Sequence, residues 1–162
     1  MNTLHPHDSA SHDNFRNARL LIVEDNPDHG IIIEHVLRQS LPEVKFVLVR
    51  TEEEALAYVE QCRLAKRELP QLILLDLYLP NREDGWRLLE RIKSIPDALG
   101  KTPVVVLSNS TNQSDIAETY DRGCSSYLVK PIGTDNWLAY FQMLRTYWWE
   151  TVTLPKADGY VV

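Results

Sequence analysis

The stretch LILLDLYLP, residues 72–80, decides how this chain folds. Its first four residues are apolar, an aspartate follows at Asp76, and Pro80 ends regular structure soon afterwards. A short apolar run that stops at a charged residue is typical of a strand buried on both faces, because a half-exposed strand alternates apolar and polar residues. The stretch therefore predicts a buried strand over 71–76, with Asp76 at its carboxyl end.

Four more apolar runs repeat this pattern along the chain, and segments with helix start or stop signals separate them. Asn26-Pro27 precedes the first such segment, a capping box from Thr51 to Glu54 opens the second, and Gly123 closes the fourth. Strands that alternate with helices and are apolar on both faces form a doubly wound α/β sheet with helices on both faces. We expect strands at 18–23, 45–50, 71–76, 102–108 and 125–130, and helices from 27, at 51–66, 84–94, 113–123 and 133–150.

The composition limits the class of protein. The 162 residues are 44% apolar and 25% charged, which is close to the globular average and enough for about one domain. A net charge of −6 argues against unaided binding to nucleic acid. No apolar stretch is long enough to span a bilayer, and the first residues lack the apolar core of a signal peptide. Cys62 and Cys124 lack zinc-ligand spacing and are too few for a disulfide framework. We expect a cytoplasmic protein that binds neither nucleic acid nor membrane.

The chain divides into one domain and two short tails. Residues 1–17 are polar and predict a flexible tail, whose histidines we interpret as solvated rather than as metal ligands. Residues 18–150 hold all the predicted elements, and 151–162 form the second tail. Because so few residues follow the last helix, we expect no output domain.

Five polar side chains come together at one edge of the predicted sheet, since ligands of open α/β sheets bind outside the carboxyl ends of the strands. Glu24 and Asp25 end the first strand, Asp76 the third, Ser108 the fourth and Lys130 the fifth. Three crowded carboxylates need a cation, and all-oxygen ligation favours Mg²⁺ or Mn²⁺. With a hydroxyl and an ammonium as donors, the set predicts a phosphoryl site. No glycine-rich loop follows the first strand, so nucleotide binding is not supported.

Over about residues 18–150 the chain resembles the receiver domain of two-component response regulators, the CheY-like fold. The motifs that carry the resemblance are LLIVEDNP (20–27), LILLDLYLP (72–80), VVVLSNS (104–110) and YLVKP (127–131). Within that family, EDNPD and DLYLP are most similar to single-domain response regulators that partner phytochrome histidine kinases. The resemblance implies a flavodoxin-like strand order 2-1-3-4-5. It also implies a signalling protein, not an enzyme, that takes a phosphoryl group from a sensor histidine kinase or a histidine phosphotransfer protein.

The resemblance also implies a role for each site residue. Asp76 matches the aspartate that accepts the phosphoryl group. Asp25 and Asp76 match the direct Mg²⁺ ligands, a third ligand is the backbone carbonyl of Tyr78, and Glu24 acts largely through metal-bound water. The remaining two, Ser108 and Lys130, match the hydroxyl and the cation that contact the phosphoryl group.

Two further residues and one loop follow from the same resemblance. Tyr127 holds the position of an aromatic that turns inward on phosphorylation, unless it is an ordinary half-buried strand tyrosine. The bond from Lys130 to Pro131 is expected to be cis, which would aim the lysine into the site. The loop LYLPNRED (77–84) is one residue longer than the common family pattern. In it, Tyr78 either shields the phosphoryl group from water or simply caps the strand.

Two other functions remain as alternatives. A Mg²⁺-dependent phosphohydrolase with an aspartyl-phosphate intermediate would carry an Asp-x-Asp pair after the first strand. Here residues 24–26 read Glu-Asp-Asn and residues 76–78 read Asp-Leu-Tyr, so that pair is missing. A degenerate receiver that serves as a scaffold would have lost part of the acidic, hydroxyl and lysine set, which is complete in this chain.

The first helix carries three consecutive isoleucines, residues 31–33. At ~100° per residue they span about 200°, which is more than one buried stripe needs, so Ile31 should be exposed near the site. In receivers this helix docks kinase or phosphotransfer helices, so Ile31 belongs to that contact or is incidentally exposed.

The last helix carries more apolar residues than one buried stripe needs, and Leu138, Met143 and Trp149 fall off the stripe. Such a surplus indicates a protein interface, and we expect a homodimer through residues 133–150. The alternative is a monomer in which the following segment folds back over the helix. The predicted stripe against the sheet consists of Trp137, Tyr140, Phe141, Leu144, Tyr147 and Trp148.

Overall fold

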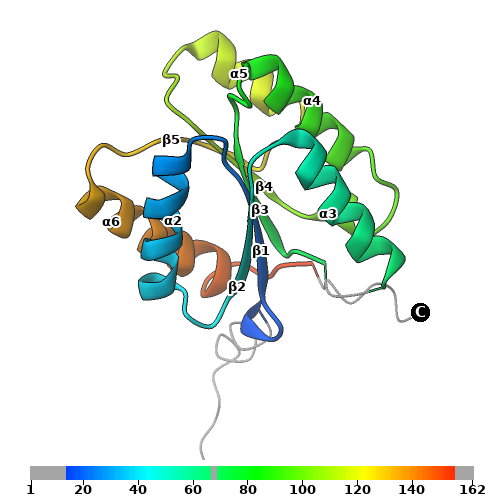
Figure 1. Cartoon of the computed structure of the whole chain (residues 1–162), viewed down its shortest axis with the longest axis horizontal. Helices are drawn as coiled ribbons and strands as arrows, with labels where there is room; N and C mark the ends of the chain where they lie inside the picture. The colour runs from blue at the N-terminus through cyan, green and yellow to red at the C-terminus, as the bar shows by residue number, and fades with distance from the viewer. Residues whose placement is uncertain (1–13, 67–68, 156–162) are drawn as a thin grey trace, which may run out of the picture.

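The computed structural model describes residues 14–66 and 69–155, and these form a parallel sheet between two layers of helices (Figure 1). The strand order is β2-β1-β3-β4-β5, and every neighbouring pair is parallel. The predicted fold class and strand order are therefore confirmed. The strands are β1 Arg19–Val23, β2 Lys45–Val49, β3 Leu72–Asp76, β4 Val104–Ser108 and β5 Ser126–Val129.

The helices lie close to their predicted positions, apart from the start of α4 and the end of the last helix, and those of the described residues cover both faces of the sheet. In Figure 1, α2 and α6 lie on one face, and α3, α4 and α5 lie on the other. A short 3-10 helix, η1 (Ala98–Lys101), precedes β4. The α-helices are α2 Pro27–Ser40, α3 Glu52–Leu64, α4 Arg82–Lys93, α5 Gln113–Asp121 and α6 Thr134–Leu144.

Side-chain caps fix where these helices begin. The Asn26 side chain accepts hydrogen bonds from the backbone N–H groups of Asp28 and His29, which starts α2. Thr51 caps α3 as predicted, by accepting from the Glu54 N–H at 3.1 Å. The Glu54 carboxylate closes the turn differently from a standard capping box, because it accepts from the Arg50 N–H at 2.8 Å and not from Thr51.

The sheet carries a separate apolar core on each face, because successive side chains of a strand point to opposite faces. Every residue of β3 and β4 is buried, as the unbroken apolar runs predicted. One core packs the sheet on α3 and α4 and includes both cysteines, Cys62 and Cys124. The other core packs the sheet on α2 and α6. Its largest fully buried side chains include Leu20, Ile22, Ile33, Leu37, Phe141 and Trp149.

The end of the last helix differs from the prediction of a continuous helix over 133–150. After α6 the chain forms a π-helical segment, η2 (Arg145–Trp149), closed by the hydrogen bond from Glu150 N to the Arg145 carbonyl at 3.1 Å. A π-turn takes more residues than an α-turn and so rotates later side chains around the axis. For this reason Trp149, predicted to lie off the buried stripe, is fully buried, whereas Tyr147, predicted to lie on it, is 53% exposed.

This change removes much of the surplus apolar surface that predicted a homodimer. Of the three side chains placed outside the stripe, Trp149 is buried, Leu138 is half-buried against the core, and Met143 alone is 46% exposed. The alternative, in which the following segment covers the tryptophans, agrees with the packing of Val152 and Leu154 into the same core.

Both ends of the described chain belong to the packed domain, although the sequence placed them in tails. Asn14 is buried, and its side chain donates to the Trp149 carbonyl at 3.1 Å and accepts from the Leu154 N–H at 3.2 Å. The rest of the predicted tails, residues 1–13 and 156–162, lies outside the described residues. Among the described helices, none is long and apolar enough to cross a membrane.

Candidate functional site

Three carboxylates meet at the carboxyl end of the central strands. Glu24 and Asp25 follow β1, and Asp76 ends β3. In the parallel β1–β3 pair, Val23 lies opposite Leu75, so the residues that follow them come side by side. One side-chain oxygen of each acid lies within 4.8 Å of the others, and the group could hold a metal ion. The predicted acidic cluster is therefore present, with Glu24 and Asp76 buried and Asp25 half-buried.

Lys130 reaches the same cluster from the end of β5. Its buried ammonium lies 2.9 Å from Glu24 Oε2 and 3.2 Å from Asp76 Oδ2. The predicted cis bond between Lys130 and Pro131 is wrong: that bond is trans, and the cis bond of the described residues joins Leu79 to Pro80. With that bond trans, the ammonium still reaches both carboxylates, and the Lys130 N–H donates to the Ser108 carbonyl at 2.8 Å at the end of β5.

The charge in this cluster is unbalanced, since three acids face one ammonium. Burial, followed by the negative charge of Glu24, raises the pKa of Asp76 to about 8, although Lys130 acts in the opposite direction. A divalent cation bound beside Asp76 would supply the missing positive charge and favour the ionised carboxylate. The ionisation of Asp76 should therefore depend on whether a cation is bound.

His29 is a site residue that the sequence reasoning missed. Its Nδ1 accepts a hydrogen bond from Lys130 Nζ at 3.0 Å and lies 3.7 Å from Glu24 Oε1. Its ring centroid lies 5.8 Å from that of Trp137 on α6. The available signal was its place in the first turn of a helix that begins at the ligand edge of the sheet.

The loop between β4 and α5 joins the predicted hydroxyl to the predicted aromatic. Ser108 is fully buried, and its Oγ accepts from the Ser110 N–H at 3.1 Å. Tyr127 is half-buried, and its hydroxyl donates to the Ser110 carbonyl at 2.8 Å. A movement of Ser108 would therefore be transmitted to Tyr127 through Ser110.

The loop after Asp76 is shaped by close backbone contacts. α4 starts at Arg82, two residues before the predicted helix, because the Asp84 carboxylate accepts from the Asn81 N–H at 3.1 Å and caps the first turn. A Cβ atom at Gly85 would lie 2.0 Å from the Leu77 carbonyl oxygen, so only glycine allows α4 to pack this close to the end of β3.

Tyr78 lies at the mouth of the site. Its N–H donates to Asp76 Oδ1 at 3.3 Å, and its hydroxyl donates to Asp115 Oδ2 at 3.1 Å. A pocket of about 500 Å³ opens between these loops. Its lining consists of Asp25, Asn26, His29, Asp76, Tyr78, Pro80, Asn109, Ser110 and Lys130.

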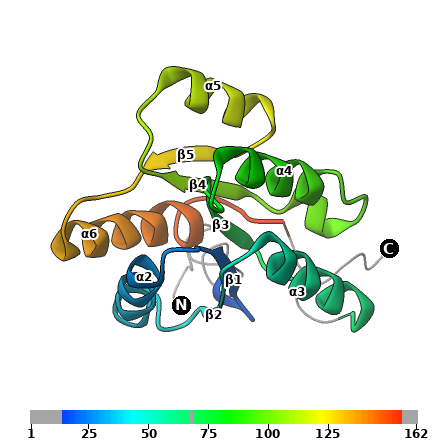
Figure 2. The same ribbon diagram turned by 45° about the horizontal axis from the view of Figure 1, so that its top comes forward.

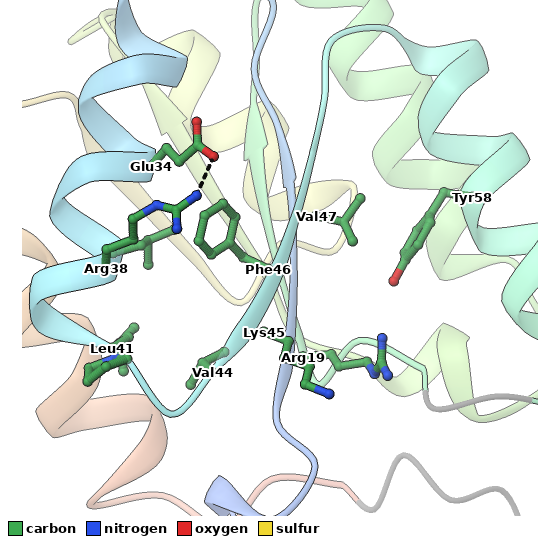
Figure 3. A pocket seen from close by; sticks show the side chains of 11 residues that line it. Arg19, Glu34, Arg38, Leu41, Val44, Lys45, Phe46, Val47 and Tyr58 are labelled. Carbon is green, nitrogen blue, oxygen red and sulfur yellow. Dashed lines mark hydrogen bonds and ion pairs between the residues drawn. The ribbon is translucent and has the colours of Figure 1, made fainter.

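A larger hollow, of about 580 Å³, lies at the edge strand β2 and has a different character (Figure 3). Figure 3 shows Phe46 on the α2 side of the strand and Val47 with Tyr58 on the α3 side. In its lining Arg38 pairs with Glu34 at 3.1 Å, and Glu34 supplies the carboxylate among the described lining residues. The chemistry predicted from the sequence therefore belongs to the smaller pocket.

The chain belongs to the response regulator receiver domain family, whose model matches residues 20–142. The matched segment spans every strand end that contributes to the site, from Glu24 to Lys130. The protein is accordingly a CheY-like receiver of a two-component system.

Two relatives are similar to the chain over most of its length. The response regulator Rcp1 of Synechocystis sp. is 35% identical over 139 residues, which cover 85% of this chain and 93% of Rcp1. The probable methanogenesis regulatory protein FilR2 of Methanothrix harundinacea is 33% identical over 129 residues, which cover 80% of this chain and 82% of FilR2.

Solved structures agree with these relatives. The phosphorylated cyanobacterial phytochrome response regulator RcpA is 37% identical, with a TM-score of 0.77, and the match covers 87% of this chain and all of RcpA. The Mn²⁺-bound form of Rcp1 is 34% identical, with a TM-score of 0.73, and the match covers 85% of this chain and 99% of Rcp1.

Proposed function

We propose that Asp76 accepts a phosphoryl group from a sensor histidine kinase or a histidine phosphotransfer protein, that the reaction requires Mg²⁺, and that phosphorylation switches the proteins this receiver binds. The observation that carries the proposal is the environment of Asp76. It is a buried carboxylate that lines an open pocket, within 4.8 Å of two other acids and 3.2 Å from the Lys130 ammonium.

The acidic cluster fits a hard divalent cation, because all its side-chain donors are oxygen atoms. Asp25 and Asp76 would bind the ion directly, together with the Tyr78 carbonyl, and Glu24 would act through water. When bound, the ion offsets the charge of the phosphoryl oxygens. The Mn²⁺-bound form of Rcp1 supports a divalent ion in this class of site.

The residues of the chain perform the transfer by position and charge. An Asp76 oxygen forms the new bond to phosphorus while the bond from phosphorus to the donor imidazole breaks. Lys130, already 3.2 Å from Asp76 Oδ2, donates to a phosphoryl oxygen. The Ser108 hydroxyl, whose oxygen accepts from Ser110, turns its own proton toward the phosphoryl group and so carries the signal to the loop that holds Tyr127. Outside this self-phosphorylation and its reversal, the receiver catalyses no reaction, which separates the proposal from a phosphohydrolase.

Labelling with a small phosphodonor tests the proposal. The full chain should become labelled with Mg²⁺ or Mn²⁺ and stay unlabelled with a chelator, and Asp76→Asn should abolish the label. Asp121→Asn, which changes an exposed aspartate at the end of α5, serves as the matched control and should label normally. Equal labelling of Asp76→Asn, or labelling in the chelator, would contradict the proposal.

Two exposed apolar residues lie close in the sequence to residues that line the pocket, and they suit contact with a kinase helix. Ile31 is 67% exposed and Ile132 is 89% exposed, and each lies two residues from a pocket residue, His29 and Lys130 respectively. The exposure predicted for Ile31 is thus confirmed. Similarity to a phytochrome response regulator favours a phytochrome-class kinase as the donor, acting in the cytoplasm. Ile31→Ala should slow transfer from the cognate kinase and leave labelling by a small phosphodonor unchanged.

A homodimer through residues 133–150 is a secondary proposal, because less apolar surface is exposed there than the sequence indicated. The large exposed apolar side chains there are Met143 and Tyr147, which lie four residues apart. Light scattering over a concentration series, with Met143→Glu as the comparison, tests it. A monomer mass at every concentration, with and without a phosphoryl mimic, would rule it out.

A further inference from the structure

Polar contacts hold α5 in place after the loop that connects it to β4. The buried residues of α5 are Asp115 and Thr119, whereas α2, α4 and α6 bury several apolar residues each. Figure 2 shows α5 at the margin of its layer, beside β5 and α4. Since burying an unpaired carboxylate is costly, the contacts of Asp115 must be specific.

Asp115 accepts hydrogen bonds from three different segments. Its Oδ2 accepts from the Ser110 hydroxyl at 2.7 Å and from the Tyr78 hydroxyl at 3.1 Å, and its Oδ1 accepts from the Arg82 guanidinium at 2.5 Å. The Ser110 hydroxyl, followed by Arg82 and Tyr78, lowers the pKa of Asp115 against the effect of burial. The carboxylate is therefore ionised and fully paired at neutral pH.

Arg82 is itself fixed by the neighbouring helix surface. Its guanidinium lies 5.1 Å from the centre of the Trp86 ring, and the Trp86 N–H donates to the Thr119 hydroxyl at 2.9 Å. That hydroxyl donates to the Asp115 carbonyl at 2.6 Å. The carboxylate, the guanidinium and the indole thus form one connected network across the seam between α4 and α5.

The donors to Asp115 lie on both sides of the phosphorylation site. Tyr78 is two residues after Asp76, Ser110 is two residues after Ser108, and both line the pocket. The rest of Ser110 is already held, because its N–H donates to Ser108 Oγ and its carbonyl accepts from Tyr127. Asp115 therefore links the loop that follows Asp76 to the loop that follows Ser108.

We propose that Asp115 is a positioning residue that holds Tyr78 and Ser110 together over the pocket mouth and thereby prolongs the life of the phosphoryl group on Asp76. In hydrolysis, a water oxygen bonds to phosphorus while the bond from phosphorus to the Asp76 oxygen breaks, which releases the carboxylate and inorganic phosphate, and the proton of the water passes to solvent. Such a water must enter through the mouth that Tyr78 and Ser110 line. This inference rests on the proposed function, because it concerns the same acyl phosphate.

The rate at which the phosphorylated full chain loses its label tests this inference. After removal of the phosphodonor, with Mg²⁺ in excess, Asp115→Asn should lose the label about three- to tenfold faster than the parent, as expected for the loss of one or two hydrogen bonds. Tyr78→Phe keeps the ring and the backbone carbonyl and removes one of these bonds, so it should give a smaller acceleration. The double variant should lose its label no faster than Asp115→Asn alone, because both changes break the same contact.

Glu118→Gln is the matched control, since Glu118 lies on the same helix and pairs with Arg122 at 2.7 Å, away from the pocket lining. Its label should decay at the parent rate. Parent-like decay in Asp115→Asn, multiplied effects in the double variant, or equal acceleration by Glu118→Gln would overturn the inference. Should Asp115→Asn not fold, parent-like decay in Tyr78→Phe alone overturns it. A parent protein that accepts no label at all refutes the proposed function instead, so the two failures are distinguishable.

Discussion

Raising the pH in the absence of a metal ion should destabilise the folded protein, and Asp76 is the reason. Its carboxyl group has a pKa of about 8 in the folded chain, against 3.8 for an unperturbed aspartate. An acid whose pKa is higher in the folded state keeps its proton there while the unfolded chain releases it. Stability is therefore greatest below the lower pKa and falls as the pH rises through the interval up to about 8.

The size of this effect follows from the same two values. Each unit between the two pKa values corresponds to about 1.4 kcal/mol, so near pH 7 the buried carboxyl lowers the free energy of unfolding by at most about 4 kcal/mol. Asp76→Asn removes the titrating group and keeps the shape of the side chain. The variant should therefore be more stable than the parent at pH 7, and the difference should shrink toward pH 4.

Urea unfolding of both proteins in a chelator, at intervals from pH 4 to pH 8, measures this difference. A control series in excess Mg²⁺ should show a smaller gap, because the cation stabilises the ionised carboxylate of the parent. A difference between the two proteins that does not change with pH, or an Asp76→Asn protein less stable than the parent at pH 7, would refute the reasoning.

Three further outcomes are expected. Asp25→Asn should weaken Mg²⁺ binding by about tenfold or more, because the site loses one of its few charged ligands, and an unchanged affinity in a titration would mean that the metal site is elsewhere. Phosphorylation should change the tryptophan fluorescence of the parent, because Trp137 lies against His29, which contacts Lys130. Lys130→Ala should bind Mg²⁺ nearly as the parent does but should not show this change once phosphorylated; a parent-like change would exclude the lysine from the switch. Trp149→Ala should lower the free energy of unfolding by about 3–5 kcal/mol, because the side chain is fully buried, whereas Met143→Ala should change it by less than about 1 kcal/mol. Similar losses from both in urea unfolding would contradict the inward turn at η2.

The strands and the acidic cluster could be predicted because both depend on local pattern. Runs such as residues 72–76 are apolar throughout, so they identify buried parallel strands, and parallel strands bring Glu24, Asp25 and Asp76 to one edge without further information. Ser108 and Lys130 follow from the same rule. Nothing beyond the order of the strands and the residues that end them was needed for these placements.

The contacts missed by sequence reasoning depend on neighbours that are distant in the chain. His29 joins the site because Lys130 lies 3.0 Å away, and Asp115 matters because Tyr78 and Arg82 reach it from a different loop and helix. The first turn of a helix places a histidine or aspartate near the ligand edge of the sheet, but it does not identify the residues that the side chain contacts. Likewise, the inward turn of Trp149 follows from the π-helical segment, and residues 145–149 show no departure from helical spacing in the sequence.

Chemical trapping of the phosphorylated residue tests the central claim most directly. Borohydride reduces an aspartyl phosphate to homoserine, and peptide mass spectrometry then locates the altered residue in the sequence. After incubation of the full chain with a small phosphodonor and Mg²⁺, the account predicts homoserine at position 76 and unmodified residues at positions 24 and 25, and it predicts no homoserine when a chelator replaces Mg²⁺. Homoserine at another position with Asp76 intact, or an equal yield at position 76 in the chelator, would contradict it.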